Sequence, residues 1–202
     1  MPPNNEVVKA TDGLAPLARP PLLLTESADE YAALVAALRQ GIKRRGVIAQ
    51  IYLEDMAAII WEIQRLRRCK TATVNNAFRP ALQSLLYKVL HTQGTIETLV
   101  DRRERVELAD GWFDSQEGRE EILAILKRFG LDETAIEAEA IRLTWSDLEM
   151  IERMQASLRL RLDKTLGCIA EYGEELGDQA REVSNRILTN DVATAFAADE
   201  AA

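Results

Sequence analysis

The chain has 202 residues, of which 47% are hydrophobic and 29% charged, and its formal net charge is -8. This composition is typical of a soluble protein that buries a core. It contains one histidine, His91, and two cysteines, Cys69 and Cys168. These counts exclude a zinc ribbon, a disulfide-dense scaffold, an HExxH site and paired ExxH di-iron sites within one chain. We therefore expect no metal and no other cofactor.

The ends of the chain differ in composition from its body. Five of the six prolines fall within the first 21 residues, and proline removes a backbone donor and disfavours helix in the residue before it. Residues 1–24 are therefore expected to form an extended, disordered lead, with a single helical domain over residues 25–188. The small, acidic residues 189–202 are expected to form a flexible tail.

Two features of the sequence predict a cytoplasmic protein that does not contact membranes. The polar N-terminal stretch lacks the charged and apolar regions of a secretory signal. No apolar run approaches the roughly 20 residues that a membrane span needs. The charge is uneven, because residues 1–110 hold 15 basic and 13 acidic residues while residues 111–202 hold 10 and 20. A basic binding surface would therefore lie in the first half, and the acidic second half is either a solvated face or a docking surface for a basic partner.

The first helices have clear boundary signals. Ser27 and Glu30 form a capping box, and Gly41 ends the helix that follows it. Apolar residues at spacings of three and four predict a second helix that begins near Val47 and ends at Gly94. Pro80 leaves two alternatives, since an interior proline either kinks one helix or separates two.

The middle of the chain predicts shorter helices. A polar stretch is expected to hold a short helix over residues 98–105. Asp114, with Glu117 three residues later, is the candidate cap of a helix that runs through Arg128. The further boundaries are a stop at Gly130, a start at Asp132 or Thr134, and an end near Ile141.

A long helix with heptad spacing is expected to follow. Ser146 and Glu149 repeat the capping-box spacing. From Leu148 to Leu176, nine positions recur at alternating steps of three and four, and seven of them are apolar, the exceptions being Gln155 and Thr165. Gly177 is the candidate stop, with a last helical piece over residues 178–188. The residues proposed for a helix-seam interface are Leu148, Ile151, Leu158, Leu162, Ile169 and Tyr172.

These patterns together predict an all-α protein, because no run alternates with a period of two as a half-buried strand does. We expect an elongated helical bundle with a long, coiled-coil-like C-terminal helix. The seam needs a partner along its length, which is either the second helix or another copy of the chain.

One part of the sequence contains the elements Thr25-Glu26, Tyr31 to Leu34, Gly46, and Leu53 to Arg68 with Trp61, Arg65 and Arg68 in place. In these elements the chain resembles a family of uncharacterised bacterial helical proteins. Residues 151–166 also resemble the second helix of that family, so that the resemblance covers about a third of the chain. It implies a helical fold and brings no activity, cofactor or catalytic residue. Members of that family often lie near mobile elements in bacterial genomes.

The first half of the chain contains the candidate contacts for phosphate groups or for a partner, which are Lys43, Arg44, Arg45, Arg65 and Arg68. Basic side chains such as these can neutralise phosphates. On a helical wheel, however, the charges around Arg65 spread over several directions, whereas a groove-reading helix concentrates them on one face. The favoured interpretation is a solvated surface that pairs with Glu62 and with the acidic second half.

No arrangement of residues predicts a catalytic site. Cys69 lies between two cations, which can activate a thiol, but a buried or partly buried structural thiol is the favoured interpretation. His91 is expected to lie at the C-terminal end of the second helix, where a positive charge interacts favourably with the helix dipole. We therefore expect a non-enzymatic protein-protein interaction or scaffold protein. The alternative is a nucleic-acid accessory factor linked to a mobile element, and a third hypothesis is a small enzyme that uses Cys69.

Overall fold

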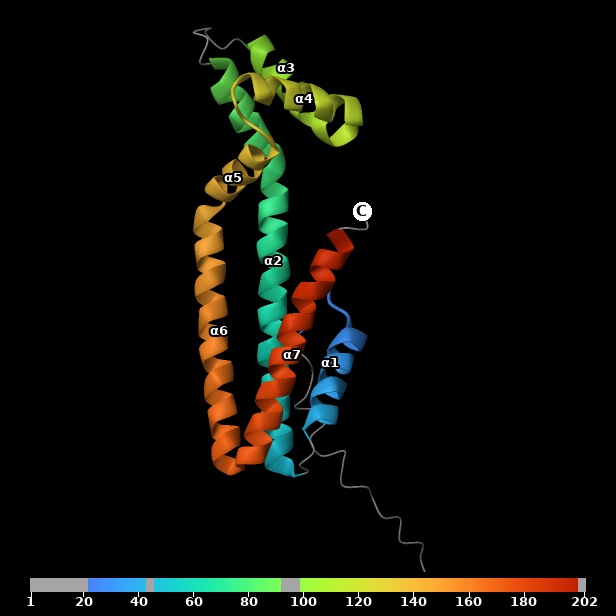
Figure 1. The fold of residues 1–202 in the computed structure, drawn as a ribbon, viewed down its shortest axis with the longest axis vertical. Helices are drawn as coiled ribbons and strands as arrows, with labels where there is room; N and C mark the ends of the chain where they lie inside the picture. The colour runs from blue at the N-terminus through green and yellow to red at the C-terminus, as the bar shows by residue number, and fades with distance from the viewer. Residues whose placement is uncertain (1–21, 43–45, 92–98, 200–202) are drawn as a thin grey trace, which may run out of the picture. The chain divides into compact units, whose positions relative to one another are not determined.

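The computed structural model describes residues 22–42, 46–91 and 99–199 (Figure 1). Within these ranges the chain forms seven helices and no strand, which confirms the all-α prediction. No helix in the described ranges has both the length and the apolar character needed to cross a membrane. The helices are α1 (Ala28–Gly41), α2 (Val47–His91), α3 (Leu99–Asp114), α4 (Gln116–Arg128), α5 (Glu133–Leu143), α6 (Trp145–Tyr172) and α7 (Glu174–Asp199).

The chain divides into two compact units. One, which we call the terminal unit, comprises residues 1–65 and 157–202, and the other, the central unit, comprises residues 66–156. Both α2 and α6 continue from one unit into the other. A single helical domain over residues 25–188 stays a prediction.

The first helix of the terminal unit begins where the capping box predicts. The Ser27 hydroxyl accepts a hydrogen bond from the Glu30 backbone N–H at 3.3 Å, which satisfies one of the free donors at the start of α1. Leu34 and Leu38 are the buried residues of this helix, four positions apart on one face. Helix α1 packs against α7 in this unit, where Gly41 approaches Val183.

Helix α2 is continuous through Pro80, so the proline does not separate two helices. An interior proline costs roughly 3 kcal/mol because it removes a hydrogen bond and clashes one turn back. Apolar residues on both sides of Pro80 are buried in the core of the central unit, among them Ala77, Ala81 and Leu85. Their burial offsets this cost and holds the helix together. The predicted end at Gly94 lies outside the described residues.

The boundaries in the central unit match the predictions at some positions and correct them at others. Helix α3 extends to Asp114, beyond the predicted short helix over residues 98–105. Asp114 is not the cap of α4, because the Ser115 hydroxyl accepts from the Gly118 N–H at 3.0 Å. Of the two starts predicted for α5, Asp132 and Thr134, the cap is Asp132, since its carboxylate accepts from the Thr134 N–H at 3.0 Å. Gly130 has a φ of +72°, a backbone conformation that favours glycine, just after α4.

The last two helices differ from the predicted boundaries in three respects. Ser146 is not a cap, because α6 already begins at Trp145. The break falls at Gly173, between α6 and α7, and not at Gly177. Gly177 lies inside α7, where an added Cβ would be 2.6 Å from the Ala170 Cβ, so its lack of a side chain permits a close approach to α6. Helix α7 continues to Asp199, past the predicted end of the last helical piece at residue 188.

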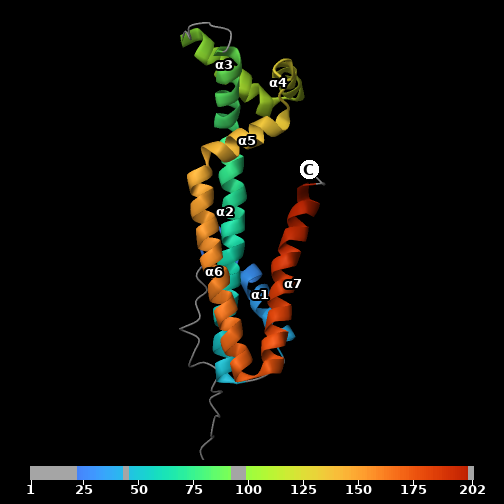
Figure 2. The ribbon, with the colours of Figure 1, turned by 60° about the vertical axis from the view of Figure 1, so that its left-hand side comes forward.

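The heptad seam of α6 is largely buried within the chain. Of the predicted interface residues, Ile151, Leu158, Leu162 and Ile169 are buried, Leu148 is half-buried, and Tyr172 is exposed. Figures 1 and 2 both show α6 alongside α2. Arg161 pairs with Glu62 in the terminal unit, and Lys70 pairs with Glu152 in the central unit. Which partner covers the seam, the second helix or another copy of the chain, stays a prediction.

Candidate functional site

A two-residue ion pair connects the start of α1 to α2 in the terminal unit. The Arg65 guanidinium donates to both carboxylate oxygens of Glu26, from Nε to Oε1 at 2.8 Å and from NH2 to Oε2 at 2.8 Å. The Leu23 backbone N–H also donates to Oε2 at 2.8 Å. Only 5% of the Glu26 side chain and 20% of the Arg65 side chain are exposed. We call this pair the Glu26–Arg65 clamp.

The surroundings of the clamp favour the charged form of Glu26. The hydrogen bonds from Arg65 lower its pKa from 4.5 to about 2, against the opposing effect of burial, and the Leu23 N–H lowers it further. The rings of Tyr31 on α1 and Trp61 on α2 pack edge to face, with centroids 5.5 Å apart. Burial raises the pKa of Tyr31, and the negative charge of Glu54 adds to this effect.

The clamp engages both oxygens of the Glu26 carboxylate. Both carboxylate oxygens of Glu26 accept hydrogen bonds from a cation that never loses its proton in a protein. A general acid or base needs a pKa near the working pH, and the Glu26 pKa lies far below it. The clamp therefore holds the residues before α1 against α2 and keeps Glu26 in its charged form.

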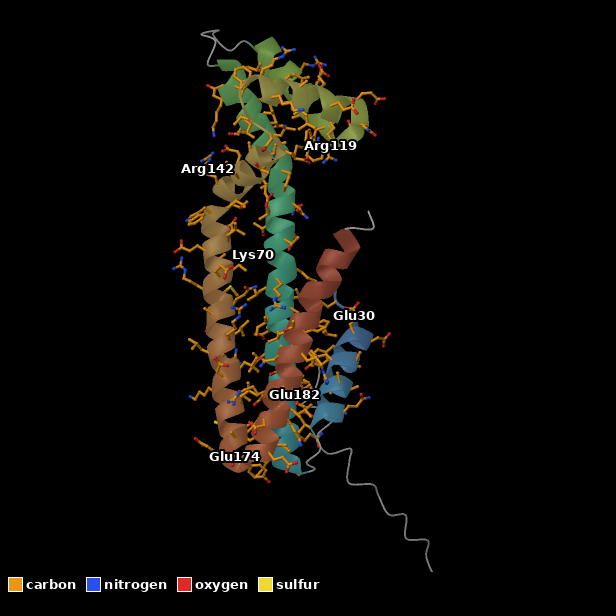
Figure 3. The ribbon with its side chains drawn as sticks, in the orientation of Figure 1. Glu30, Lys70, Arg119, Arg142, Glu174 and Glu182 are labelled. Atoms are coloured by element: carbon orange, nitrogen blue, oxygen red, sulfur yellow. The ribbon has the colours of Figure 1, made fainter. Side chains whose placement is uncertain are left out.

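A second buried carboxylate organises the central unit. Glu139 on α5 accepts from the Ser84 hydroxyl at 2.6 Å and from Lys88 Nζ at 2.9 Å, both on α2. Arg142, one turn further along α5 and labelled in Figure 3, donates to both Glu139 oxygens at 2.8 and 2.7 Å. The hydrogen bonds from Arg142 lower the pKa of Glu139 from 4.5 to about 2, and those from Ser84 and Lys88 act in the same direction.

The Glu139 cluster shows how the unit tolerates a buried charge. Its side chain is only 5% exposed, and an isolated carboxylate in such a place would take up a proton. Two cations and a hydroxyl compensate the lost hydration, which makes the cluster a specific link between α2 and α5. Sequence reasoning missed it, and the only signals were the spacings of Ser84 with Lys88 and of Glu139 with Arg142, which place each pair on one helix face.

The structure does not bring the candidate phosphate contacts together into one described surface. Arg65 is engaged in the clamp, and Arg68 is exposed on the part of α2 that belongs to the central unit. The run of three basic residues, Lys43, Arg44 and Arg45, lies outside the described residues. The clamp itself was not predicted, although Glu26, Tyr31, Trp61 and Arg65 are all among the residues on which the family resemblance rests.

The cysteines and the histidine are placed as follows. Cys69 is exposed on α2, so the prediction of a buried or partly buried thiol is wrong, while Cys168 is half-buried. His91 is the last described residue of α2, and its interaction with the helix dipole stays a prediction. Across the ranges that the structure describes, no three His, Cys, Asp or Glu side chains are grouped so that they could hold a metal ion.

An apolar surface lies at the start of α2. Val47, Ile48 and Ile51 are 63%, 48% and 51% exposed, and they fall on one side of the first helical turns. Further along the same helix, Met56, Ile60 and Ile63 are fully buried. We call the three exposed side chains the α2 patch.

Comparison of the chain with protein-family models, with curated proteins and with solved structures finds no match.

Proposed function

We propose that the protein is a non-enzymatic helical protein that binds a protein partner through the α2 patch. The observation that carries this proposal is the exposure of Val47, Ile48 and Ile51 in a helix whose other apolar residues in the terminal unit are mostly buried. Contiguous apolar side chains on a surface mark interaction sites, because their removal from water on binding is favourable.

The surroundings of the α2 patch support this proposal. Both ribbon views show the start of α2 at the same end of the terminal unit as the turn between α6 and α7 (Figures 1 and 2). Tyr172, the last residue of α6, is 45% exposed there. Aromatic side chains are enriched in the cores of interfaces, since they combine a large apolar area with a polar group.

Two described carboxylates have strongly lowered pKa values, and both are bound by cations in a way that favours a binding role over catalysis. Glu26 and Glu139 are fully engaged by cations. The alternative, a nucleic-acid accessory factor, is weakened because Arg65 forms an ion pair with Glu26. That alternative now depends on Arg68, which is exposed, and on Lys43, Arg44 and Arg45.

The elongated bundle and the membership of the bacterial family are part of the same proposal. The ion pairs of Glu62 with Arg161 and of Lys70 with Glu152 support an antiparallel pairing of α2 with α6 in each unit. A long pairing of this kind would present one end of the bundle to a partner while its seam stays covered.

The test is site-specific photocrosslinking of the full chain. A photoreactive residue replaces Ile51 in one variant and Asp55, which is exposed one turn later on α2, in the matched control. We expect a discrete adduct with one protein, or with a second copy of the chain, from position 51 and a much weaker one from position 55. The adduct from position 51 should disappear when Val47 and Ile48 are replaced by glutamine.

Two results would overturn the proposal. One is the lack of any adduct from position 51 in an extract of the source cells. The other is equal adduct formation at positions 51 and 55, which would indicate random collision. Analytical ultracentrifugation of the purified chain distinguishes a second copy from a different partner, because only the former raises the mass of the protein alone.

A further inference from the structure

A groove lies between α3 and α4 in the central unit, well separated in sequence from the α2 patch. Its volume is about 420 Å³, within the range of roughly 300–1,000 Å³ that is typical of ligand sites. It opens beside the tight turn at Ser115, the single residue that joins the two helices. The residues that line it are Glu107, Leu108, Gly111, Gly118 and Glu121.

Two glycines and a leucine form the apolar part of this groove. An added Cβ on Gly118 would lie 2.3 Å from the Gly111 carbonyl oxygen, so the two helices touch backbone to backbone here. Leu108 is half-buried and packs against the core of the central unit. Since neither glycine projects a side chain into the groove, an extended aliphatic chain can lie along this surface.

Each helix contributes one carboxylate beside the apolar part. Glu107 lies on α3 and Glu121 on α4, and both are exposed. Glu107 already accepts from Arg103 Nε at 3.0 Å one turn earlier on α3, which demonstrates that a guanidinium can reach it. An exposed pair of this kind is weak and exchanges readily with a competing cation.

We propose that this groove binds an arginine-bearing or lysine-bearing segment of a protein partner. The aliphatic part of the basic side chain lies on Leu108 and the glycine backbone, and its charged end lies between Glu107 and Glu121. Arginine and lysine combine these two requirements, since both have an apolar stem and a cationic head. Charge complementarity selects this occupant over an acidic or purely apolar segment. The proposal is independent of the α2 patch, which lies in the other unit.

The test measures binding of fluorescein-labelled hexa-arginine to the full chain by fluorescence anisotropy. The variant Glu107→Gln/Glu121→Gln removes both carboxylates, and Glu120→Gln/Glu137→Gln is the matched control, with the same change in charge at exposed positions outside the lining of the groove. We expect Kd to rise about fivefold or more in the groove variant and less than twofold in the control. Circular dichroism checks that all proteins are equally folded.

Nuclear magnetic resonance gives a site-specific readout. The amide signals of Gly111 and Gly118 should shift on addition of hexa-arginine, while that of Gly167, in the terminal unit, should not. Equal loss of affinity in the two variants, or unmoved signals from Gly111 and Gly118, would overturn the proposal, because binding would then be general charge attraction. The same shifts with Ca²⁺ alone and no competition from hexa-arginine would also overturn it, in favour of a cation site.

Discussion

Arg65 and Glu26 are 39 positions apart in the sequence, yet the hydrogen bonds from Arg65 Nε and NH2 to the two Glu26 oxygens are both 2.8 Å long. This bidentate geometry matches the fork of a guanidinium to the two oxygens of a carboxylate. It ties the residues before α1 to the middle of the longest helix. The clamp therefore fixes where α1 begins relative to α2 in the terminal unit.

Replacing Arg65 by methionine should lower the free energy of unfolding by about 3 kcal/mol. The substitution keeps an unbranched side chain of similar length but leaves the Glu26 carboxylate buried without its cation, which costs about 3–5 kcal/mol when a pair is fully buried. Urea unfolding followed by circular dichroism measures the change. The control is Arg103→Met, which removes an exposed i,i+4 pair and should change stability by less than about 0.5 kcal/mol. Equal effects of the two substitutions would contradict this prediction.

Stability should fall as the pH is lowered from about 5 towards 2. The pKa values of Glu26 and Glu139 are about 2 in the folded protein against an ordinary value of 4.5, so the unfolded chain binds protons first. The stabilisation is fully present above the unfolded pKa and is lost as the pH falls through the folded one, with a loss on the order of 2 kcal/mol for each carboxylate. Urea midpoints measured across this range should follow this slope. Glu139→Gln should make the slope shallower, and an unchanged slope would refute the role of Glu139.

The substitution Gly118→Ala should destabilise the central unit. The new methyl group would be 2.3 Å from the Gly111 carbonyl oxygen, and backbone cannot move aside as a flexible side chain can. We expect a loss of about 2–3 kcal/mol, in spite of the higher helix propensity of alanine. The control is Gly167→Ala in α6, where an added Cβ meets nothing within 4 Å and alanine should stabilise by about 0.5–1 kcal/mol. Thermal melting of both variants would reveal opposite shifts in Tm, and shifts of the same sign would contradict the close contact.

Gly41 and Val183 should be energetically coupled. An added Cβ at Gly41 would lie 2.1 Å from Val183 Cγ2, where α1 packs against α7. Gly41→Ala should therefore destabilise the wild-type chain but cost much less when Val183→Ala has removed the clashing methyl groups. A double-mutant cycle from urea unfolding should give a coupling energy of at least about 1 kcal/mol, as expected for residues in contact. Additive effects within about 0.3 kcal/mol would show that the two residues do not touch.

The local signals of the sequence found most of the helices. The side chains of Ser27 and Asp132 cap their own helices within three residues, and such contacts are visible in the sequence because they are local. Errors arose where neighbouring residues offered competing signals. Asp114 and Ser115 can both serve as caps, and in the structure Ser115 caps α4 while Asp114 is the last residue of α3.

The helix stop predicted at Gly177 was wrong for a similar reason. Gly173 and Gly177 are four residues apart, and either could end a helix. The helix ends before Gly173, whereas Gly177 packs closely against Ala170. The different roles of the two glycines depend on how α7 folds back on α6. Likewise, the spacing around Cys69 did not reveal which face of α2 the core would cover.

The sequence by itself determined that the protein is all-α and where α1 begins, since helix formation and capping depend on residues within a few positions. Only the tertiary structure decided that Pro80 lies inside one helix and that Arg65 binds Glu26. These outcomes depend on charges and apolar groups that are distant in sequence. Their pairing is decided by which arrangement buries the core while leaving each buried charge with a partner.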